Sequence, residues 1–266
     1  MSEIIQSEAN ARFKRWKKLI DNARHIKKEG VTLAEGAHLV QTILERGIVP
    51  EAMIVRAAGL NAEASELFDK FSAKRVPYFV LDSRLYDVLS PVEHGCGLML
   101  EVKVPSAALP QALPVDVLYL DGVQDPGNIG TMIRTAVAAG VTHIAGSSAC
   151  ANFWSAKALR AGMGAHFAAT LYENVPANLL GEAFAAKRFA ADARGGQDLY
   201  RDTQWHITPC VWMMGSEGQG LGEVALSVAD ARYYIPITEG CESLNVGAAA
   251  AVCLFEQRRR RLTATC

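Results

Sequence analysis

The chain has 266 residues, half of them hydrophobic and 21% charged, which suffices for one large or two small folded domains and excludes a disordered tail protein. Lys and Arg (27) nearly balance Asp and Glu (28), so a nucleic-acid partner has to be bound by local patches. No apolar run reaches the roughly 18 residues of a membrane span, and the N-terminus lacks a signal core. Six cysteines without a C-x-x-C pair favour reduced thiols, no metal and a cytoplasmic protein.

The first hundred residues begin with a basic cluster, in which eight Lys or Arg residues fall between positions 12 and 28. Phe13 and Trp16 lie among them, which predicts a basic helix with an aromatic handle for a nucleic acid or, equally, a solvated helix face. Strands then alternate with helices, as is typical of a small α/β sandwich. The expected strands are 31–35, 52–56, 76–81 and 98–104, and the expected helices are 37–45, 62–71 and 83–89.

Residues 105–114 hold three of the ten prolines in the chain. Because proline fixes φ and donates no hydrogen bond, this segment is expected to be extended and unpaired. It predicts a division into a first domain (1–104), a linker (105–114) and a second domain (115–266).

The second domain repeats the alternation of short apolar strands and helices, which predicts a parallel sheet covered on both faces. Ligands of such sheets bind at the carboxyl ends of the strands. The expected strands are 115–120, 141–145, 166–171, 189–192, 210–214 and 233–237, and the expected helices are 129–139, 156–162, 177–186 and 244–260.

The first candidate loop follows the strand 115–120 and is rich in Gly, Pro and Asp. Asn128 stands where a helix N-cap is expected, and Arg134 lies off the apolar stripe of the helix that follows. Both side chains could therefore face one crevice. Spacing alone favours a plain structural role, with Asn128 as a cap and Arg134 as a surface charge.

The second candidate loop, Gly215–Leu221, follows an apolar strand and carries one carboxylate, Glu217. Its glycines allow a ligand to approach the backbone closely. Gly220 and Gly222 also fit a dinucleotide-binding G-x-G-x-x-A pattern, but no acidic ribose partner follows about twenty residues later. We interpret that match as accidental.

The third candidate loop runs from Ile235 to Val246, with Ser243 in position to cap the long last helix. That helix closes with four arginines, 258–261, which suit the negative end of its dipole and also form a second possible nucleic-acid patch. Asn245 lies beside Ser243 and Leu244 in the same loop.

In this order and spacing, the three loops resemble the motifs of the SpoU (TrmH-like) family of RNA ribose 2′-O-methyltransferases, within the SPOUT superfamily. The matching segments are Asn128-x₅-Arg134, Gly215–Leu221 and Ile235-Pro-x₆-Ser243-Leu-Asn-Val246. The stretch Leu33–Val40 is similar to the L30e-like substrate-binding domain that many members carry. Two departures are Gly247, where many relatives have serine, and Ala34, where valine is more usual.

The resemblance implies a C-terminal SPOUT (α/β-knot) domain whose last segment threads through a loop to form a trefoil knot, one of the exceptions to the no-knot rule. It implies S-adenosylmethionine as the cofactor, held mainly by backbone groups around Gly215, Ile235 and Leu244. It also implies a homodimer through helices 129–139 and 244–260, in which each active site borrows residues from its neighbour.

The family's catalytic centre maps to Arg134, with Asn128, Glu217, Ser243 and Asn245 around it. A guanidinium stays protonated in proteins and is a poor base. We therefore expect Arg134 to bind the RNA phosphate and stabilise the forming alkoxide, with Glu217 orienting it through a charge-assisted hydrogen bond.

The added N-terminal domain favours rRNA, most of all 23S rRNA, over tRNA as the substrate, and the 2′-hydroxyl distinguishes RNA from DNA. The rival from another class is a catalytically inactive RNA-binding protein, which would be expected to lack Arg134 or Glu217.

Overall fold

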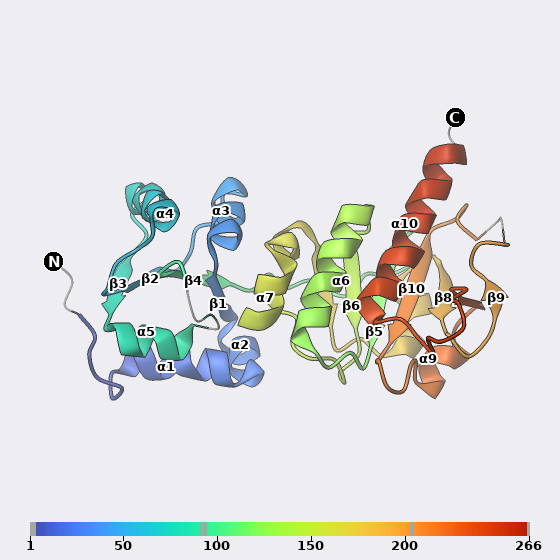
Figure 1. Cartoon of the computed structure of the whole chain (residues 1–266), viewed down its shortest axis with the longest axis horizontal. Coiled ribbons are helices and arrows are strands. Elements are labelled where there is room, and N and C mark those ends of the chain that lie inside the picture. Colours follow the sequence, from blue (N-terminus) through green and yellow to red (C-terminus); the bar gives the residue numbers. More distant parts are fainter. Residues whose placement is uncertain (1–3, 91, 93–94, 203–204, 265–266) are drawn as a thin grey trace. The chain divides into compact units, whose positions relative to one another are not determined.

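The computed structural model describes residues 4–90, 92, 95–202 and 205–264. The chain forms two compact units, which are Met1–Pro105 with Trp154–Phe167, and Ser106–Phe153 with Ala168–Cys266 (Figure 1). The segment 154–167, predicted inside the second domain, thus belongs to the first unit. There the Thr32 hydroxyl donates to the backbone oxygen of Trp154 at 2.6 Å.

Residues 105–114 contain no helix or strand, as expected, but they are not unpaired. The backbone N–H groups of Ala112 and Leu113 donate to the carbonyls of Glu182 and Ala183, at 2.8 and 3.0 Å. Both hydrogen bonds lie within the second unit, so the end of this segment is part of that unit rather than a free linker.

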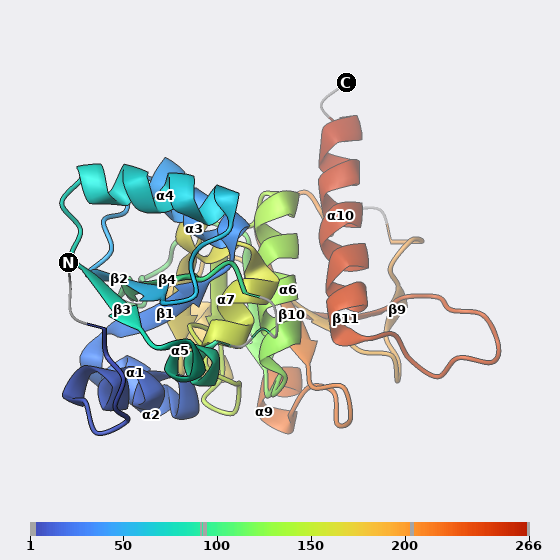
Figure 2. The same cartoon turned by 60° about the vertical axis from the view of Figure 1, so that its left-hand side comes forward.

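The first unit is a mixed four-stranded sheet with helices on both faces (Figure 2). The strand order is β1-β4-β2-β3, where β4 is antiparallel to both neighbours and β2 is parallel to β3. The strands are β1 (Val31–Glu35), β2 (Ala52–Arg56), β3 (Tyr78–Leu81) and β4 (Leu98–Lys103). The helices are α1 (Ala11–Asp21), α2 (Ala23–Glu29), α3 (Ala37–Glu45), α4 (Ala62–Ala73), α5 (Ser83–Leu89) and α7 (Ala156–Gly162).

The basic cluster forms two helices, α1 and α2, rather than one. Asn22 separates them, and its side chain accepts a hydrogen bond from the N–H of Arg24, which starts the second helix. Phe13 and Trp16 are each 1% exposed and pack in the core, so the predicted aromatic handle for a nucleic acid is wrong. The Trp16 indole donates to Glu101 at 2.7 Å, which ties α1 to the sheet.

A buried carboxylate lies at the end of β1. Glu35 is 3% exposed and accepts hydrogen bonds from the Tyr86 hydroxyl (2.8 Å) and the Ser90 hydroxyl (2.6 Å). Burial raises the pKa of Glu35, although these two hydrogen bonds and the charge of Arg160 lower it in part. The carboxyl is therefore held closer to its neutral form than a solvated one.

The raised pKa of Glu35 makes stability depend on pH. A carboxyl whose pKa is higher in the folded than in the unfolded protein stabilises the fold at low pH, and that contribution is lost as pH rises through the folded pKa. We therefore expect Glu35→Gln to compare more favourably with wild type in stability at pH 8 than at pH 5. Thermal melts of both proteins at the two pH values measure this difference. Asp69→Asn, at an exposed carboxylate on α4, is the control, and an equal pH response of both variants would contradict the prediction.

The second unit is a seven-stranded sheet in which every described pair of neighbouring strands is parallel, which confirms the predicted α/β class. The strand order is β7-β6-β5-β10-β8-β11-β9. The strands are β5 (Val117–Asp121), β6 (His143–Gly146), β7 (Thr170–Glu173), β8 (Lys187–Ala191), β9 (Gln197–Asp198), β10 (Cys210–Gly215) and β11 (Ala231–Tyr234).

Helices cover both faces of this sheet. On one face α6 (Pro126–Ala139) packs against α10 (Val246–Ala264), which also contacts β10. The Trp212 indole on this face donates to Gln257 of α10 at 2.8 Å. On the other face, Met213 belongs to a buried cluster with residues of α8 (Leu180–Ala183) and α9 (Glu223–Ser227). The alternation along β10 therefore explains why all six of its residues are buried.

Further predicted elements of the second domain differ in the structure. Residues Ala165–Ala168 form a 3₁₀ helix where the start of a strand was expected. The helix expected over 177–186 is a 3₁₀ turn (Ala177–Leu179) followed by the single turn α8, since Phe184 is already extended. The last helix starts at Val246 instead of Leu244.

Three of the four C-terminal arginines bind backbone or side-chain groups of other segments, and the fourth, Arg259, pairs with Glu256 of its own helix. Arg260, 8% exposed, donates to the backbone oxygens of Leu199 and Tyr200 at 2.9 and 3.0 Å. Arg261 donates to Asp116, and Arg258 donates to the backbone oxygen of Ala139. The contacts of Arg258, Arg260 and Arg261 with other segments of the chain argue against a nucleic-acid patch at these three residues. Arg261 lies in the last turn of the helix, where a dipole partner was expected.

Within the described ranges, no helix combines the length and the apolar character needed to cross a membrane. The same ranges contain no cluster of three or more His, Cys, Asp or Glu residues that could hold a metal ion.

Candidate functional site

The first loop starts α6 three residues earlier than the sequence predicts. Asp125 is the N-cap, and its side chain accepts a hydrogen bond from the N–H of Asn128 at 3.1 Å. Pro126 occupies the first turn, where its missing N–H costs nothing. The prediction that Asn128 caps the helix is therefore wrong, and its side chain is left available for other contacts.

Asn128 joins the other two loops. Its side-chain N–H donates to the Glu217 carboxylate, and its side-chain oxygen accepts from Asn245 at 3.4 Å. Three loops that are far apart in the sequence are thus linked by three polar side chains.

Asn245, rather than Ser243, caps the last helix. Its side-chain oxygen accepts hydrogen bonds from the N–H groups of Gly247 (2.9 Å) and Ala248 (3.4 Å). The predicted cap at Ser243 is wrong because α10 begins two residues later than expected. A Cβ at Gly247 would lie 3.1 Å from this same oxygen, so the glycine gives the cap room.

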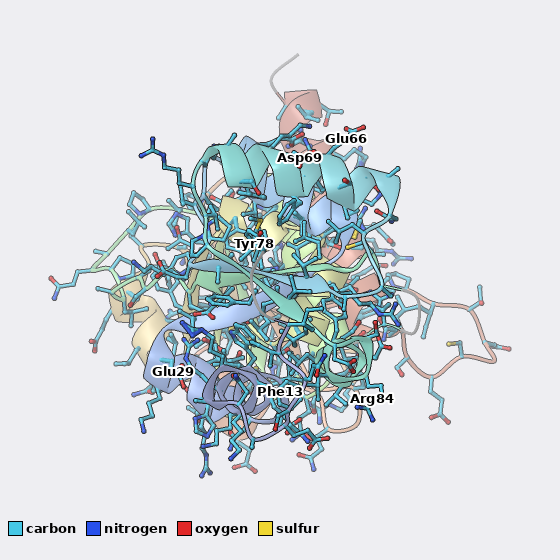
Figure 3. The ribbon with its side chains drawn as sticks, turned by 90° about the vertical axis from the view of Figure 1, so that its left-hand side faces the viewer. Phe13, Glu29, Glu66, Asp69, Tyr78 and Arg84 are labelled. Carbon is cyan, nitrogen blue, oxygen red and sulfur yellow. The ribbon has the colours of Figure 1, made fainter. Side chains whose placement is uncertain are left out.

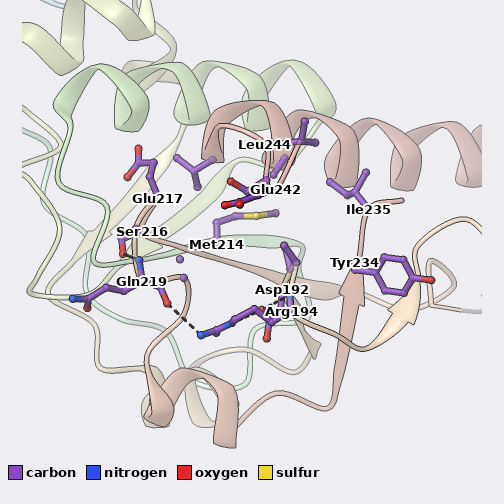
Figure 4. Close-up of a pocket in the computed structure, with 18 of the residues that line it drawn as sticks. Asp192, Arg194, Met214, Ser216, Glu217, Gln219, Tyr234, Ile235, Glu242 and Leu244 are labelled. Atoms are coloured by element: carbon purple, nitrogen blue, oxygen red, sulfur yellow. Dashed lines mark hydrogen bonds and ion pairs between the residues drawn. The ribbon is translucent and has the colours of Figure 1, made fainter. Parts of the chain in front are cut away.

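A pocket of about 420 Å³ lies at the carboxyl ends of β8, β10 and β11 (Figure 4). Gly215, Ile235 and Leu244, the three predicted cofactor-binding residues, all line it, and so do Glu217 and Ser243. Its size and mixed apolar and polar walls are those of small-molecule sites. The other lining residues are Ala191, Asp192, Ala193, Arg194, Met214, Ser216, Gly218, Gln219, Gly220, Tyr233, Tyr234, Ile237, Glu242, Val246 and Ala249.

The second loop folds back tightly on the end of β10. Ser216 and Gly220 exchange two backbone hydrogen bonds, at 3.1 and 2.9 Å, and Gly220 has a φ of +70°. Because of this turn, a Cβ at Gly215 would overlap the backbone of Gly220 and Leu221. Two residues after Gly220, the N–H of Gly222 donates to the carboxylate of Asp121 at the end of β5 (2.9 Å). Glycine is therefore required where this loop leaves the sheet.

This geometry excludes the dinucleotide-binding interpretation of Gly220 and Gly222. Gly220 closes the turn onto Ser216 instead of opening a phosphate loop, and the helix that follows, α9, has only five residues.

Arg134 lies apart from the pocket of its own chain. Its side chain is exposed on α6 and is not among the pocket residues, and in the described part of the chain it forms no hydrogen bond or ion pair with Asn128 or Glu217. The structure therefore brings together Asn128, Glu217 and Asn245, but not Arg134.

Sequence reasoning missed a charged pair at the pocket. Asp192, 8% exposed, follows β8, and its carboxylate accepts from the Nε of Arg194 at 2.9 Å. Glu242 also lines the pocket. The available signal was position, because Asp192 comes at the carboxyl end of a predicted strand, where ligands of parallel sheets bind.

Comparison with known proteins identifies the family. Residues 116–255 match the SpoU rRNA Methylase family, and residues 10–97 match the MRM3-like substrate binding domain. The 23S rRNA (guanosine(2553)-2′-O)-methyltransferase RlmP of Bacillus subtilis is 30% identical over 96% of this chain and 98% of its own. The mitochondrial rRNA methyltransferase 3 of Mus musculus is 26% identical over 88% and 68%.

Among solved structures, the SpoU methyltransferase AviRb from Streptomyces viridochromogenes in complex with AdoMet has a TM-score of 0.80. It covers 96% of this chain and 100% of its own, at 23% sequence identity, so it shares the fold. With one family match spanning the three loops and a second spanning the first unit, the chain belongs to the SpoU rRNA methylase family.

Proposed function

We propose that this chain transfers the methyl group of S-adenosylmethionine to a ribose 2′-hydroxyl of RNA, with 23S rRNA as the substrate. The observation that carries the proposal is the link from Asn128 to Glu217 and Asn245, because it joins all three motif loops beside the pocket. The RlmP and mitochondrial relatives, which are named as rRNA methyltransferases, support rRNA. We also propose a cytoplasmic location, where a bacterial rRNA methyltransferase such as the RlmP relative would meet its substrate.

The pocket fits this cofactor. The three backbone segments around Gly215, Ile235 and Leu244 offer hydrogen-bonding groups, while Met214 adds apolar surface for a base and a sulfonium. When bound, the cofactor supplies a methyl group on a sulfonium, which is a good leaving group for an in-line displacement. The protein has to position the two reactants and stabilise the developing oxyanion.

We assign Arg134 to the RNA side of the reaction. Its exposed guanidinium can bind a backbone phosphate and stabilise the forming alkoxide, while the proton leaves to phosphate or water. Glu217, held by Asn128, is the carboxylate that would orient it, and Ser243 would orient the ribose. Because both Arg134 and Glu217 are present, the chain retains what an inactive RNA-binding relative would lack.

We further propose a homodimer in which Arg134 reaches the pocket of the neighbouring chain. Arg134 is absent from its own pocket, and α10, which packs on α6, leaves Phe255 45% and Leu262 59% exposed. Apolar side chains of this size on a helix favour association with a second copy.

Mixing two inactive variants tests this sharing. Arg134→Ala leaves the pocket intact, whereas Leu244→Arg fills the pocket and leaves Arg134 intact. In a twofold dimer, random re-assortment makes about half of the dimers mixed, and each mixed dimer has one complete site out of two. About a quarter of wild-type methylation should therefore return. No recovery, with sedimentation showing that mixed dimers form, would place Arg134 and the pocket in the same chain.

A cluster of exposed basic residues lies on one side of the sheet of the first unit. The exposed basic residues of α1 and α2 lie there, whereas α4 on the opposite face carries Glu66 and Asp69 (Figure 3). RNA phosphates favour the basic side. The exposed basic residues of these two helices are Arg12, Lys14, Lys18, Arg24, Lys27 and Lys28.

Charge reversal at Lys14 and Lys18 together is expected to weaken RNA binding by about tenfold or more and to reduce its salt dependence. Binding to an rRNA fragment, measured by filter retention at several salt concentrations, checks this result, and cofactor affinity should not change. The control is the same double charge reversal at Lys70, in α4, and Lys74, the residue that follows α4. If both double variants weaken RNA binding equally, α1 is not the contact surface.

The proposed reaction is tested directly by incubating the protein with methyl-labelled S-adenosylmethionine and either rRNA or tRNA, followed by nucleoside analysis. Label should appear in a 2′-O-methylnucleoside of rRNA. Label on a base, or in tRNA alone, would contradict the proposal.

A further inference from the structure

The pocket contains four charged side chains, and only one of them is positive. Asp192, Glu217 and Glu242 are carboxylates, and Arg194 is the single cation among the described residues that line the pocket. Glu217 already accepts a hydrogen bond from Asn128. A ligand with an anionic group can therefore find a charged partner at Arg194.

Arg194 is held in a defined position between two loops. Its Nε donates to Asp192 Oδ1 at 2.9 Å, and its backbone N–H donates to the same oxygen at 3.1 Å. Its Nη1 reaches the backbone oxygen of Gln219 at 3.5 Å (Figure 4). Asp192 is buried, so the carboxylate fixes the base of the arginine while the guanidinium faces the pocket.

A guanidinium has five N–H donors, and these side-chain contacts use two of them. The remaining donors can bind a carboxylate, for which the planar fork of arginine is well suited. Figure 4 shows Glu242 near Leu244, on the side of the pocket away from Asp192 and Arg194. The pocket thus presents a negative and a positive side chain on different walls, which complements a zwitterion.

We propose that Arg194 binds the α-carboxylate of the methionine part of S-adenosylmethionine, and that Asp192 is the positioning residue that aims it. This inference rests on the proposed function, and it adds a side chain that selects the cofactor to the backbone groups around Gly215, Ile235 and Leu244. Arg232, which also lies near Asp192 (3.9 Å) but does not line the pocket, has no part in it.

The test compares two ligands that differ only in this group, S-adenosylmethionine and decarboxylated S-adenosylmethionine, by calorimetry on the full chain. The wild-type protein should prefer the carboxylated ligand by about tenfold or more, as expected of a hydrogen bond between charged groups. Arg194→Gln should lose most of this preference by weakening S-adenosylmethionine alone. Arg232→Gln, the matched control, should keep it.

Asp192→Asn separates positioning from binding. It should reduce the preference between the two ligands without the complete loss seen in Arg194→Gln, and a merely structural role would weaken both ligands equally. Equal weakening of both ligands in Arg194→Gln, or no preference in the wild-type protein, overturns the proposal. If the wild-type protein binds neither ligand, the proposed function itself fails, which is a different result from binding both equally.

Discussion

Replacing Arg134 by alanine is expected to lower methyl transfer by about a hundredfold or more, which is the usual cost of removing a group that stabilises a developing oxyanion. Cofactor affinity should change little, because Arg134 does not line the pocket of its own chain and, in the proposed dimer, acts on the RNA side of the neighbouring site. Its side chain is exposed, so stability should also be retained. Single-turnover methylation of rRNA, together with calorimetry and a thermal melt, measures all three quantities.

Arg201→Ala is the matched control for this substitution. Arg201 belongs to the same unit, its side chain is 89% exposed, and it pairs only with Asp198 among the described residues. This control should keep full activity. Arg134→Lys should recover only part of the rate, since lysine keeps the charge but not the planar fork. If Arg134→Ala lost cofactor binding, stability and activity together, Arg134 would support the fold instead of the chemistry.

Among Gly→Ala substitutions at the glycines that line the pocket, Gly215→Ala is expected to have the largest structural effect. The added Cβ would overlap the backbone of Gly220 and Leu221, which cannot move aside as a flexible side chain would. We expect a loss of about 1–3 kcal/mol of stability, as is typical of overpacking, and loss of measurable cofactor binding. Denaturant unfolding and calorimetry measure the two effects.

Gly218→Ala controls for the glycine content of the same loop. A Cβ at Gly218 would meet no described atom within 4 Å, so the substitution should change stability by no more than about 0.5 kcal/mol. Similar effects of the two substitutions would show that the turn between Ser216 and Gly220 is not what shapes the pocket.

The sequence predicted the residues of the site better than their local roles. Gly215, Ile235 and Leu244 line one pocket, yet the caps assigned to Asn128 and Ser243 are made by Asp125 and Asn245. Asn, Asp and Ser all cap helices well, so composition alone does not tell which member of a polar loop does so. The error matters because the side chain of Asn128, free of the cap, joins the loops.

Long-range packing accounts for the rest of what the sequence did not predict. The basic pattern of α1 gave no sign that Trp16 would be buried against Glu101, a residue 85 positions away. The arginines at the end of α10 were expected to be dipole partners or a nucleic-acid patch, but Arg260 binds backbone carbonyls of the 199–202 segment. The assignment of residues 154–167 to the first unit likewise depends on contacts between distant segments. Threading of the C-terminal segment into a knot, for the same reason, was implied by the family resemblance alone.

The most direct test of the account is a map of 2′-O-methylated nucleotides in rRNA and tRNA from the source organism, with and without this protein. The account predicts that one 23S rRNA nucleotide loses its methyl group, that the wild-type chain restores it, and that the Arg134→Ala chain does not. An unchanged set of methyl groups in 23S rRNA, or a loss confined to tRNA, would contradict it.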